Sequence, residues 1–192
     1  LITLHAIKGA PAVFDFKKKT PNGRVIILLT GTDIYQGLAE GSQIGGDALQ
    51  VADRIVVPQE AALRKLPEKV RGKTVVIRPS LDPIAVKATS SQSPFVISVV
   101  GHLRPVKRPF LTIETLAQHP EWSDLEVWQI GQALDAEMRK TAEVWMEEDK
   151  RYRWCGGLPR EESLALCAKS SLTINSSILE GGANAVLEAM TM

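Results

Sequence analysis

Short apolar runs recur along the chain and alternate with longer segments in which apolar residues repeat at helical spacing. Runs of strand length are predicted at 2–5, 24–30, 54–57, 74–78, 95–101, 125–130, 152–155 and 172–175. Helical patterns lie between them at 9–18, 35–50, 59–66, 108–118, 134–148, 160–169 and 183–192. No hairpin signal joins neighbouring strands, so the alternation predicts an α/β fold with parallel sheets whose faces are covered by helices.

The segment from 79 to 94 interrupts this alternation. It holds three prolines, Pro79, Pro83 and Pro94, and a run of polar residues at 89–93. Proline cannot donate to a strand ladder, and polar residues have little to bury, so this composition is typical of a linker. We expect an N-terminal domain at 1–82, a linker at 83–94 and a C-terminal domain at 95–192. Because the chain begins in an apolar run and stops within a helical one, we expect both domains to be incomplete.

Composition narrows the class of protein. Hydrophobic residues make up 44% of the chain and charged residues 23%, as in ordinary globular proteins. The net charge of +1 predicts no broad electrostatic field that would attract nucleic acid or a membrane surface. Apolar runs fall well short of the roughly 18 residues that span a bilayer. No leader is recognisable at the start, so we expect a cytoplasmic protein without a membrane span.

The chain has two cysteines, Cys155 in a predicted strand and Cys167 in a predicted helix. Neither has histidine neighbours at the spacing that metal sites use. We therefore expect buried free thiols, with neither a disulfide nor a metal site.

The segment from Glu180 to Glu188 carries two glutamates separated by seven residues, which begin with Gly181 and Gly182 and continue through Ala183 and Asn184. It follows the predicted strand 172–175 and leads into the last helical pattern. A turn of this kind leaves unpaired backbone N–H groups at the start of a helix, where phosphate groups bind. The spacing alone is equally consistent with a tightly packed turn.

A second candidate segment follows the buried strand 95–101. It places His102, Arg104, Lys107 and Arg108 within seven positions. Ligands of parallel α/β sheets bind outside the carboxyl ends of the strands, so a cationic loop there predicts an anion site.

These motifs occur in an order that resembles the retaining glycosyltransferases of the GT4 family. The ordered set is the loop at 101–107, Gly131 at the end of the next strand, the turn at 154–158 and the segment 180–188. The resemblance covers 95–192 well and the earlier residues more loosely. It implies the GT-B architecture, two Rossmann-like domains with parallel sheets that face each other across a cleft, and transfer from a UDP-sugar donor.

The resemblance also implies roles for individual residues, with no metal ion and no cofactor beyond the donor. Lys107 and Arg104 would contact the donor diphosphate, and His102 stands where family members usually have arginine. Backbone groups near Gly157 and Leu158 would hold the uracil base. Glu188 would bind the ribose hydroxyls and Glu180 would face the donor sugar. Amides of Gly182, Ala183 and Asn184 would bind sugar hydroxyls or phosphate.

A narrower likeness concerns the bacterial subgroup that contains selenosugar synthases of the selenoneine pathway. It rests on the segments 29–35, 56–60, 100–104, 151–159 and 180–183. It implies that the acceptor is selenophosphate, which would need cationic or hydroxyl groups. The acceptor-side candidates are Lys8, Thr30, Gly31, Thr32 and Asp33.

Two interpretations of Asp33 remain open, an acceptor-side group and the N-cap of the following helix. His5, at the end of a predicted strand, is interpreted as a packed histidine.

Two alternatives to selenosugar synthesis remain open. The first is a GT4 hexosyltransferase with a hydroxyl or lipid-linked acceptor. The second is a sugar-nucleotide-binding module without catalytic activity. The sequence determines neither the donor sugar nor the oligomeric state.

Overall fold

The computed structural model describes residues 1–82, 84, 86 and 93–192. The chain divides into two compact units. The first comprises Leu1–Ser80 and Leu179–Gly182, and the second comprises Leu81–Ile178 and Ala183–Met192. Each unit is built on a four-stranded sheet in which all paired strands are parallel. The linker predicted at 83–94 falls largely outside the described residues.

The first unit has the strand order β1-β2-β3-β4, so each strand pairs with its neighbours in sequence. Its strands are β1 (Ile2–Leu4), β2 (Ile26–Leu28), β3 (Arg54–Val57) and β4 (Thr74–Val76). Its helices are α1 (Ala10–Lys19), the π-helical turn η1 (Asp33–Gly37), α2 (Gln43–Val51), α3 (Glu60–Lys65) and α4 (Glu68–Arg71).

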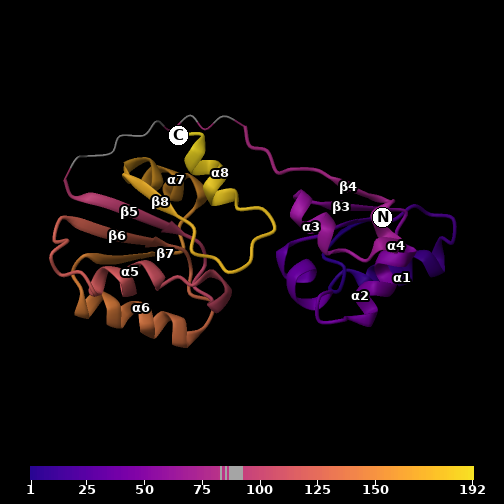
Figure 1. The fold of residues 1–192 in the computed structure, drawn as a ribbon, viewed down its shortest axis with the longest axis horizontal. Helices are drawn as coiled ribbons and strands as arrows, with labels where there is room; N and C mark the ends of the chain where they lie inside the picture. The colour runs from indigo at the N-terminus through magenta and orange to yellow at the C-terminus, as the bar shows by residue number, and fades with distance from the viewer. Residues whose placement is uncertain (83, 85, 87–92) are drawn as a thin grey trace. The chain divides into compact units, whose positions relative to one another are not determined.

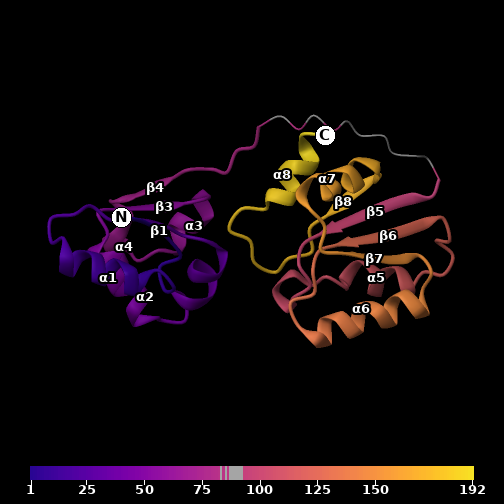
Figure 2. The ribbon, with the colours of Figure 1, turned by 180° about the vertical axis from the view of Figure 1, so that it is seen from behind.

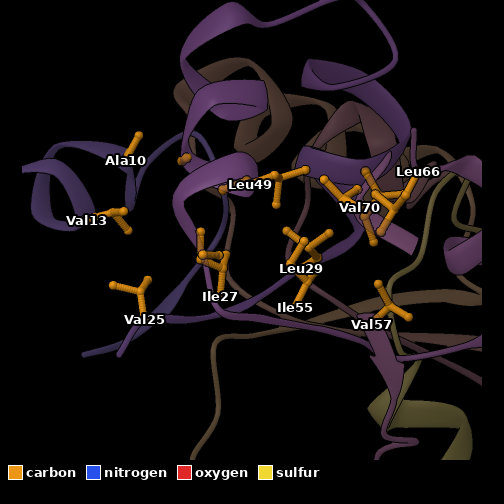
Figure 3. Close-up of a cluster of buried hydrophobic side chains, with 14 of the residues drawn as sticks. Ala10, Val13, Val25, Ile27, Leu29, Leu49, Ile55, Val57, Leu66 and Val70 are labelled. Atoms are coloured by element: carbon orange, nitrogen blue, oxygen red, sulfur yellow. The ribbon is translucent and has the colours of Figure 1, made fainter. Parts of the chain in front are cut away.

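The core of this unit follows the two-residue period of its strands. Ile27 on β2 and Ile55 and Val57 on β3 are fully buried. Figure 3 shows their side chains on the side of the sheet where the helical residues Leu49 and Val70 lie. Because alternate strand residues point to the same face, one apolar set packs beneath the helices.

The second unit has the strand order β7-β6-β5-β8. Its strands are β5 (Phe95–Val100), β6 (Leu125–Ile130), β7 (Tyr152–Gly156) and β8 (Leu172–Ile174). Its helices are the 3₁₀ turn η2 (Pro105–Lys107), α5 (Leu111–Ala117), α6 (Ala136–Glu148), α7 (Arg160–Lys169) and α8 (Asn184–Met190). Figures 1 and 2 show α5 and α6 on one face of the sheet and α7 and α8 on the other.

The order of strands in the second unit reverses at β5. The chain passes from β5 outward through β6 to β7, and β8 then returns to the other side of β5. Such a reversal is a topological switch point, where the loops that leave two neighbouring strands diverge and open a crevice. A ligand site is therefore expected at the carboxyl ends of β5 and β8.

All eight predicted strands are confirmed, although several are shorter than expected. The helix predicted at 35–50 is wrong, since η1 and α2 are separate and Gly41 between them has φ of +84°. That left-handed conformation ends a helix and suits glycine. The helix predicted at 108–118 begins at Leu111, because Arg108 adopts a left-handed conformation after η2. The short helix α4 was not predicted.

Candidate functional site

The loop that follows β5 is hydrogen-bonded to the segment that follows β8. Ser176 Oγ donates to the carbonyl oxygens of Lys107 and Arg108, both at 2.9 Å. The backbone N–H of Ile178 donates to the carbonyl of Val106 at 2.9 Å. The basic loop therefore lies at the switch point, against the chain that leads toward α8.

The same loop is fixed on its other side by the residues that follow β6. The N–H of Leu103 donates to the carbonyl of Gln132 at 2.9 Å, and the N–H of Gln132 donates to His102 Nδ1 at 3.2 Å. Leu103 also pairs with Ala133 in an isolated parallel bridge, and its side chain is fully buried. These contacts continue the pairing of β5 and β6 beyond the sheet and give the basic loop a defined path.

Gly131 makes this close approach possible. Its φ is +154°, and a Cβ at this position would lie 2.0 Å from the carbonyl oxygen of Gly101. Its own carbonyl accepts a hydrogen bond from Trp154 Nε1 at 2.8 Å, and its N–H donates to the carbonyl of Gly156 at 2.8 Å. Only glycine fits at a position of this conformation and closeness.

The cationic side chains of the loop differ in burial. His102 and Arg104 are exposed, whereas Lys107 is half-buried. The stem of Lys107 passes over Gly101, since its Cδ lies 3.9 Å from the position of a Cβ on that glycine. A lysine whose stem packs in this way keeps its ammonium group near the carboxyl edge of the sheet.

Glu188, on α8, forms an ion pair with a residue that was not predicted. Its Oε1 accepts a hydrogen bond from Arg160 Nε at 2.9 Å. The glutamate side chain is 18% exposed and the arginine 60%. Because the arginine is largely exposed to solvent, the ion pair contributes little to stability. Its main effect is to orient the carboxylate of Glu188. Arg160 gives no signal in the sequence because its partner lies 28 positions away.

The turn after β7 borders a cavity of about 480 Å³. Its lining includes Trp154, Leu158 and Leu166. Gly157 packs against Gln132, whose Cβ lies 3.0 Å from the position of a Cβ on that glycine. The size and mixed lining of the cavity suit a small ring system.

Both cysteines are free, as predicted. They are only partly buried, however, which corrects the expectation of buried thiols. Burial still raises the pKa of Cys155 and of Cys167 above the usual range of a thiol. Both side chains are therefore in the neutral thiol form at neutral pH.

Part of the predicted donor segment belongs to the first unit. Within that unit, the backbone of Gly181 packs against Gly31, and a Cβ on either glycine would lie less than 3.0 Å from the other's nitrogen. Gln59 Nε2 donates to the carbonyl of Glu180 at 3.2 Å and to Tyr35 Oη at 2.9 Å. Gly31, predicted on the acceptor side, and Gly181, predicted on the donor side, are thus in contact.

Asp33 is fully buried at the end of the loop that follows β2. Its carboxylate accepts hydrogen bonds from the backbone N–H groups of Ala6, Thr30 and Ile34 and from Thr30 Oγ1. It is the first residue of η1, and Thr32 occupies the cap position. These contacts favour a structural role for Asp33, in which it ties the ends of β1 and β2 together.

Two further acceptor-side candidates, Thr32 and Lys8, contact His5. Thr32 Oγ1 lies 3.3 Å from His5 Nε2, and the N–H of Lys8 donates to His5 Nδ1 at 3.3 Å. The Lys8 side chain is exposed. His5 itself has φ of 66°, an uncommon conformation for a residue with a Cβ.

Among the described residues, no three His, Cys, Asp or Glu side chains gather in a way that could hold a metal ion. Within the same residues, no helix is both long and apolar enough to cross a membrane.

Solved structures similar to the chain include a galactosyltransferase and two sugar-phosphate synthases. HepE from Anabaena, in complex with UDP and glucose, superposes with a TM-score of 0.72 at 20% identity over 97% of this chain and 54% of its own. Sucrose-phosphate synthase from Thermosynechococcus elongatus gives 0.76 at 17% over 98% and 53%. The UDP-forming α,α-trehalose-phosphate synthase from Burkholderia vietnamiensis gives 0.75 at 14% over 100% and 56%.

No protein-family model and no curated protein sequence matches the chain. At these identities the likeness establishes the fold, which is that of the GT-B glycosyltransferases and confirms the predicted fold class. The chain spans about half the length of the structures it matches.

Proposed function

We propose that the chain is part of a glycosyltransferase that uses a UDP-sugar donor. The observation that carries the proposal is the basic loop after β5, hydrogen-bonded through Ser176 and Ile178 to the segment after β8 at the switch point. Anions bind at this place in parallel α/β sheets. The GT-B fold adds support, because similar structures include one complexed with UDP and glucose and one described as UDP-forming.

In this proposal, Lys107 and Arg104 neutralise the charge that develops on the diphosphate as the sugar leaves. His102 and the amides of Gly182, Ala183 and Asn184 supply further donors. This arrangement stabilises the leaving group with cationic side chains and backbone dipoles, as the resemblance to metal-independent GT4 enzymes implies. Neutralisation by fixed groups needs no rearrangement during the reaction.

The remaining donor contacts follow from the resemblance together with the observed surroundings. Glu188 binds the ribose hydroxyls, and its ion pair with Arg160 holds the carboxylate in one orientation. Gly157 and Leu158 hold the uracil base beside the cavity after β7. Glu180 stabilises the positive charge that the sugar ring gains as its bond to the phosphate lengthens. Retention places the new bond on the face that the leaving group vacates.

Substitution of Lys107 by methionine is expected to weaken UDP binding about 10- to 150-fold, because one charged hydrogen bond contributes roughly 1.5–3 kcal/mol. Methionine keeps most of the stem that packs over Gly101. Isothermal titration calorimetry with UDP measures the dissociation constant. Glu188→Gln should weaken binding of UDP while leaving binding of pyrophosphate unchanged, since it alters the proposed ribose contact.

The matched control is Lys140→Met, which makes the same change at an exposed position of α6. It should bind UDP as the unaltered chain does. If Lys107→Met and Lys140→Met bind UDP equally well, the proposed donor site is wrong.

The acceptor that we propose is selenophosphate. The bond from the anomeric carbon to the β-phosphate oxygen breaks, UDP leaves with the electron pair, and selenium forms the new bond to the same carbon. Lys8, Thr30, Gly31 and Thr32 are the proposed acceptor-side residues, and Asp33 acts by holding their loop.

An assay of the complete protein with UDP-N-acetylglucosamine tests this acceptor. We expect UDP release that requires selenophosphate and that phosphate or sugar alcohols do not support. Release with a hydroxyl acceptor alone would favour a hexosyltransferase instead. UDP binding without release for any acceptor would favour a binding module.

A further inference from the structure

Gln129 occupies a position where a parallel sheet ordinarily buries an apolar residue. It lies on β6 and pairs in register with Val99 on β5 and Trp154 on β7. Val99 pairs in turn with Ile174 on β8, so the four side chains form one row across the sheet. Gln129 is 1% exposed. A buried amide is costly unless it is hydrogen-bonded, so its presence in an apolar row calls for a physical reason.

One half of the amide is used to hold the start of the basic loop. Gln129 Nε2 donates to the carbonyl oxygen of Gly101 at 3.2 Å. This is the carbonyl beside which Gly131 must lack a side chain, and Gly101 is the residue over which the stem of Lys107 passes. The hydrogen bond therefore acts on the backbone directly beneath the lysine.

The other half of the amide has no hydrogen-bond partner among the described residues, since Gln129 Oε1 is buried and unpaired there. Gln129 borders a cavity of about 10 Å³, which has room for about one water molecule. The cavity is also bordered by Gly101, Lys107 and Pro109, and by residues 174–177, which begin with the last residue of β8. It thus lies between the two chain segments that form the candidate site.

We propose that Gln129 is the positioning residue of the basic loop. Its Nε2 fixes the carbonyl of Gly101, and its Oε1 accepts a hydrogen bond from a water molecule in the cavity. That water also hydrogen-bonds to the segment after β8, so one buried amide holds both segments of the switch point. The proposal deepens the proposed function and rests on it only where the loop is said to bind UDP.

Two measurements on the whole chain test this inference. The first is hydrogen exchange of the backbone amides at 101–109 without ligand, and the second is the dissociation constant of UDP. In Gln129→Met, which keeps the length of the side chain but lacks both polar groups, we expect exchange about 5- to 50-fold faster and UDP binding at least about 5-fold weaker. Gln118→Met makes the same change at an exposed position after α5 and should alter neither value.

Gln129→Glu provides a second variant with a signature that simple loss of packing does not produce. Its carboxylate faces the carbonyl of Gly101 and cannot donate to it, whereas the protonated acid can. Burial favours the protonated form of this glutamate. The ratio of the variant's UDP affinity to that of the unaltered chain, both measured at the same pH, should therefore rise as the pH falls. Gln118→Glu should show a constant ratio.

The outcomes separate the two proposals. If the Gln129 variants exchange at 101–109 no faster than the Gln118 variants, the positioning role is overturned, whether or not UDP binds. If exchange is faster but UDP binds unchanged, the link between this loop position and the nucleotide is overturned. If the unaltered chain binds no UDP, the proposed function fails, and the exchange rates still decide what Gln129 does.

Discussion

The Gly131→Ala variant is expected to lose at least about 3 kcal/mol of unfolding free energy together with measurable UDP binding. The added Cβ would come within 2.0 Å of the carbonyl oxygen of Gly101, and the residue would have to keep φ of +154°. An unfavourable backbone conformation alone costs about 1–3 kcal/mol, and the steric conflict adds to it. Relief requires the start of the basic loop to move away from β6, which displaces Lys107 as well.

Urea denaturation measures the stability of this variant, and calorimetry measures its UDP affinity. Gly46→Ala serves as the control because nothing lies within 4 Å of a Cβ there and the position is inside helix α2. Alanine in a helix should be neutral or stabilise by about 0.5–1 kcal/mol. Equal stability of the two variants would contradict the proposed packing of Gly131 against Gly101.

The apolar pattern predicted the architecture because the order of strands and helices depends on local periodicity. Parallel strands buried on both faces read as apolar runs, such as 95–101, and these are recognisable without knowledge of their partners. Element ends were less predictable. The segment 35–50 has helical periodicity throughout, yet Ser42 caps α2 through its Oγ and Gly41 ends the preceding turn. The apolar period continues across both residues, so it did not indicate the break.

The candidate site was predictable where its residues are close in sequence. The cationic loop and the glutamate segment are such motifs, and the structure places the loop at the switch point. The loop is held by the distant residues Ser176 and Gln129, and Glu188 is held by Arg160. Of these, only Gln129 could have been noticed in the sequence, as an amide within the predicted strand 125–130. Ser176 and Arg160 have no local pattern because their roles depend on how the strands are ordered.

Sequence patterns did not predict that the donor segment is divided between the two units. The predicted motif treats 180–188 as one turn and helix. In the structure, Glu180, Gly181 and Gly182 belong to the first unit, while Ala183 to Glu188 belong to the second. The pair of glycines at 31 and 181 explains the first assignment, since each leaves room for the backbone of the other. Their partnership spans 150 positions of chain and has no local periodicity.

Arg151→Met is expected to destabilise the second unit by roughly 2–4 kcal/mol. The guanidinium donates to both carboxylate oxygens of Asp149, at 2.9 and 2.6 Å. It also donates to the carbonyls of Leu116, His119 and Trp122, which end α5 and lead toward β6. The side chains of Arg151 and Asp149 are 17% and 13% exposed, so removal of the arginine leaves several partly buried acceptors unpaired. Denaturation in urea at neutral pH measures the loss.

The same substitution should change how stability depends on pH. The hydrogen bonds from Arg151 lower the pKa of Asp149 below its usual range. A carboxyl with a lowered pKa in the folded state stabilises the fold above its unfolded pKa of about 3.9, and this contribution is lost as the pH falls through the folded pKa. Without the guanidinium, its lowering effect on the pKa of Asp149 is lost, while burial and the backbone N–H of residue 151 act in opposite directions, so the fall in stability below about pH 4 should become shallower. Lys150→Met removes an exposed neighbouring cation and serves as the control. Its free energy of unfolding should stay within about 0.5 kcal/mol of that of the unaltered chain, both at neutral pH and at each acidic pH. If Arg151→Met loses no more unfolding free energy than Lys150→Met, Arg151 does not hold the segment between α5 and β6 in place.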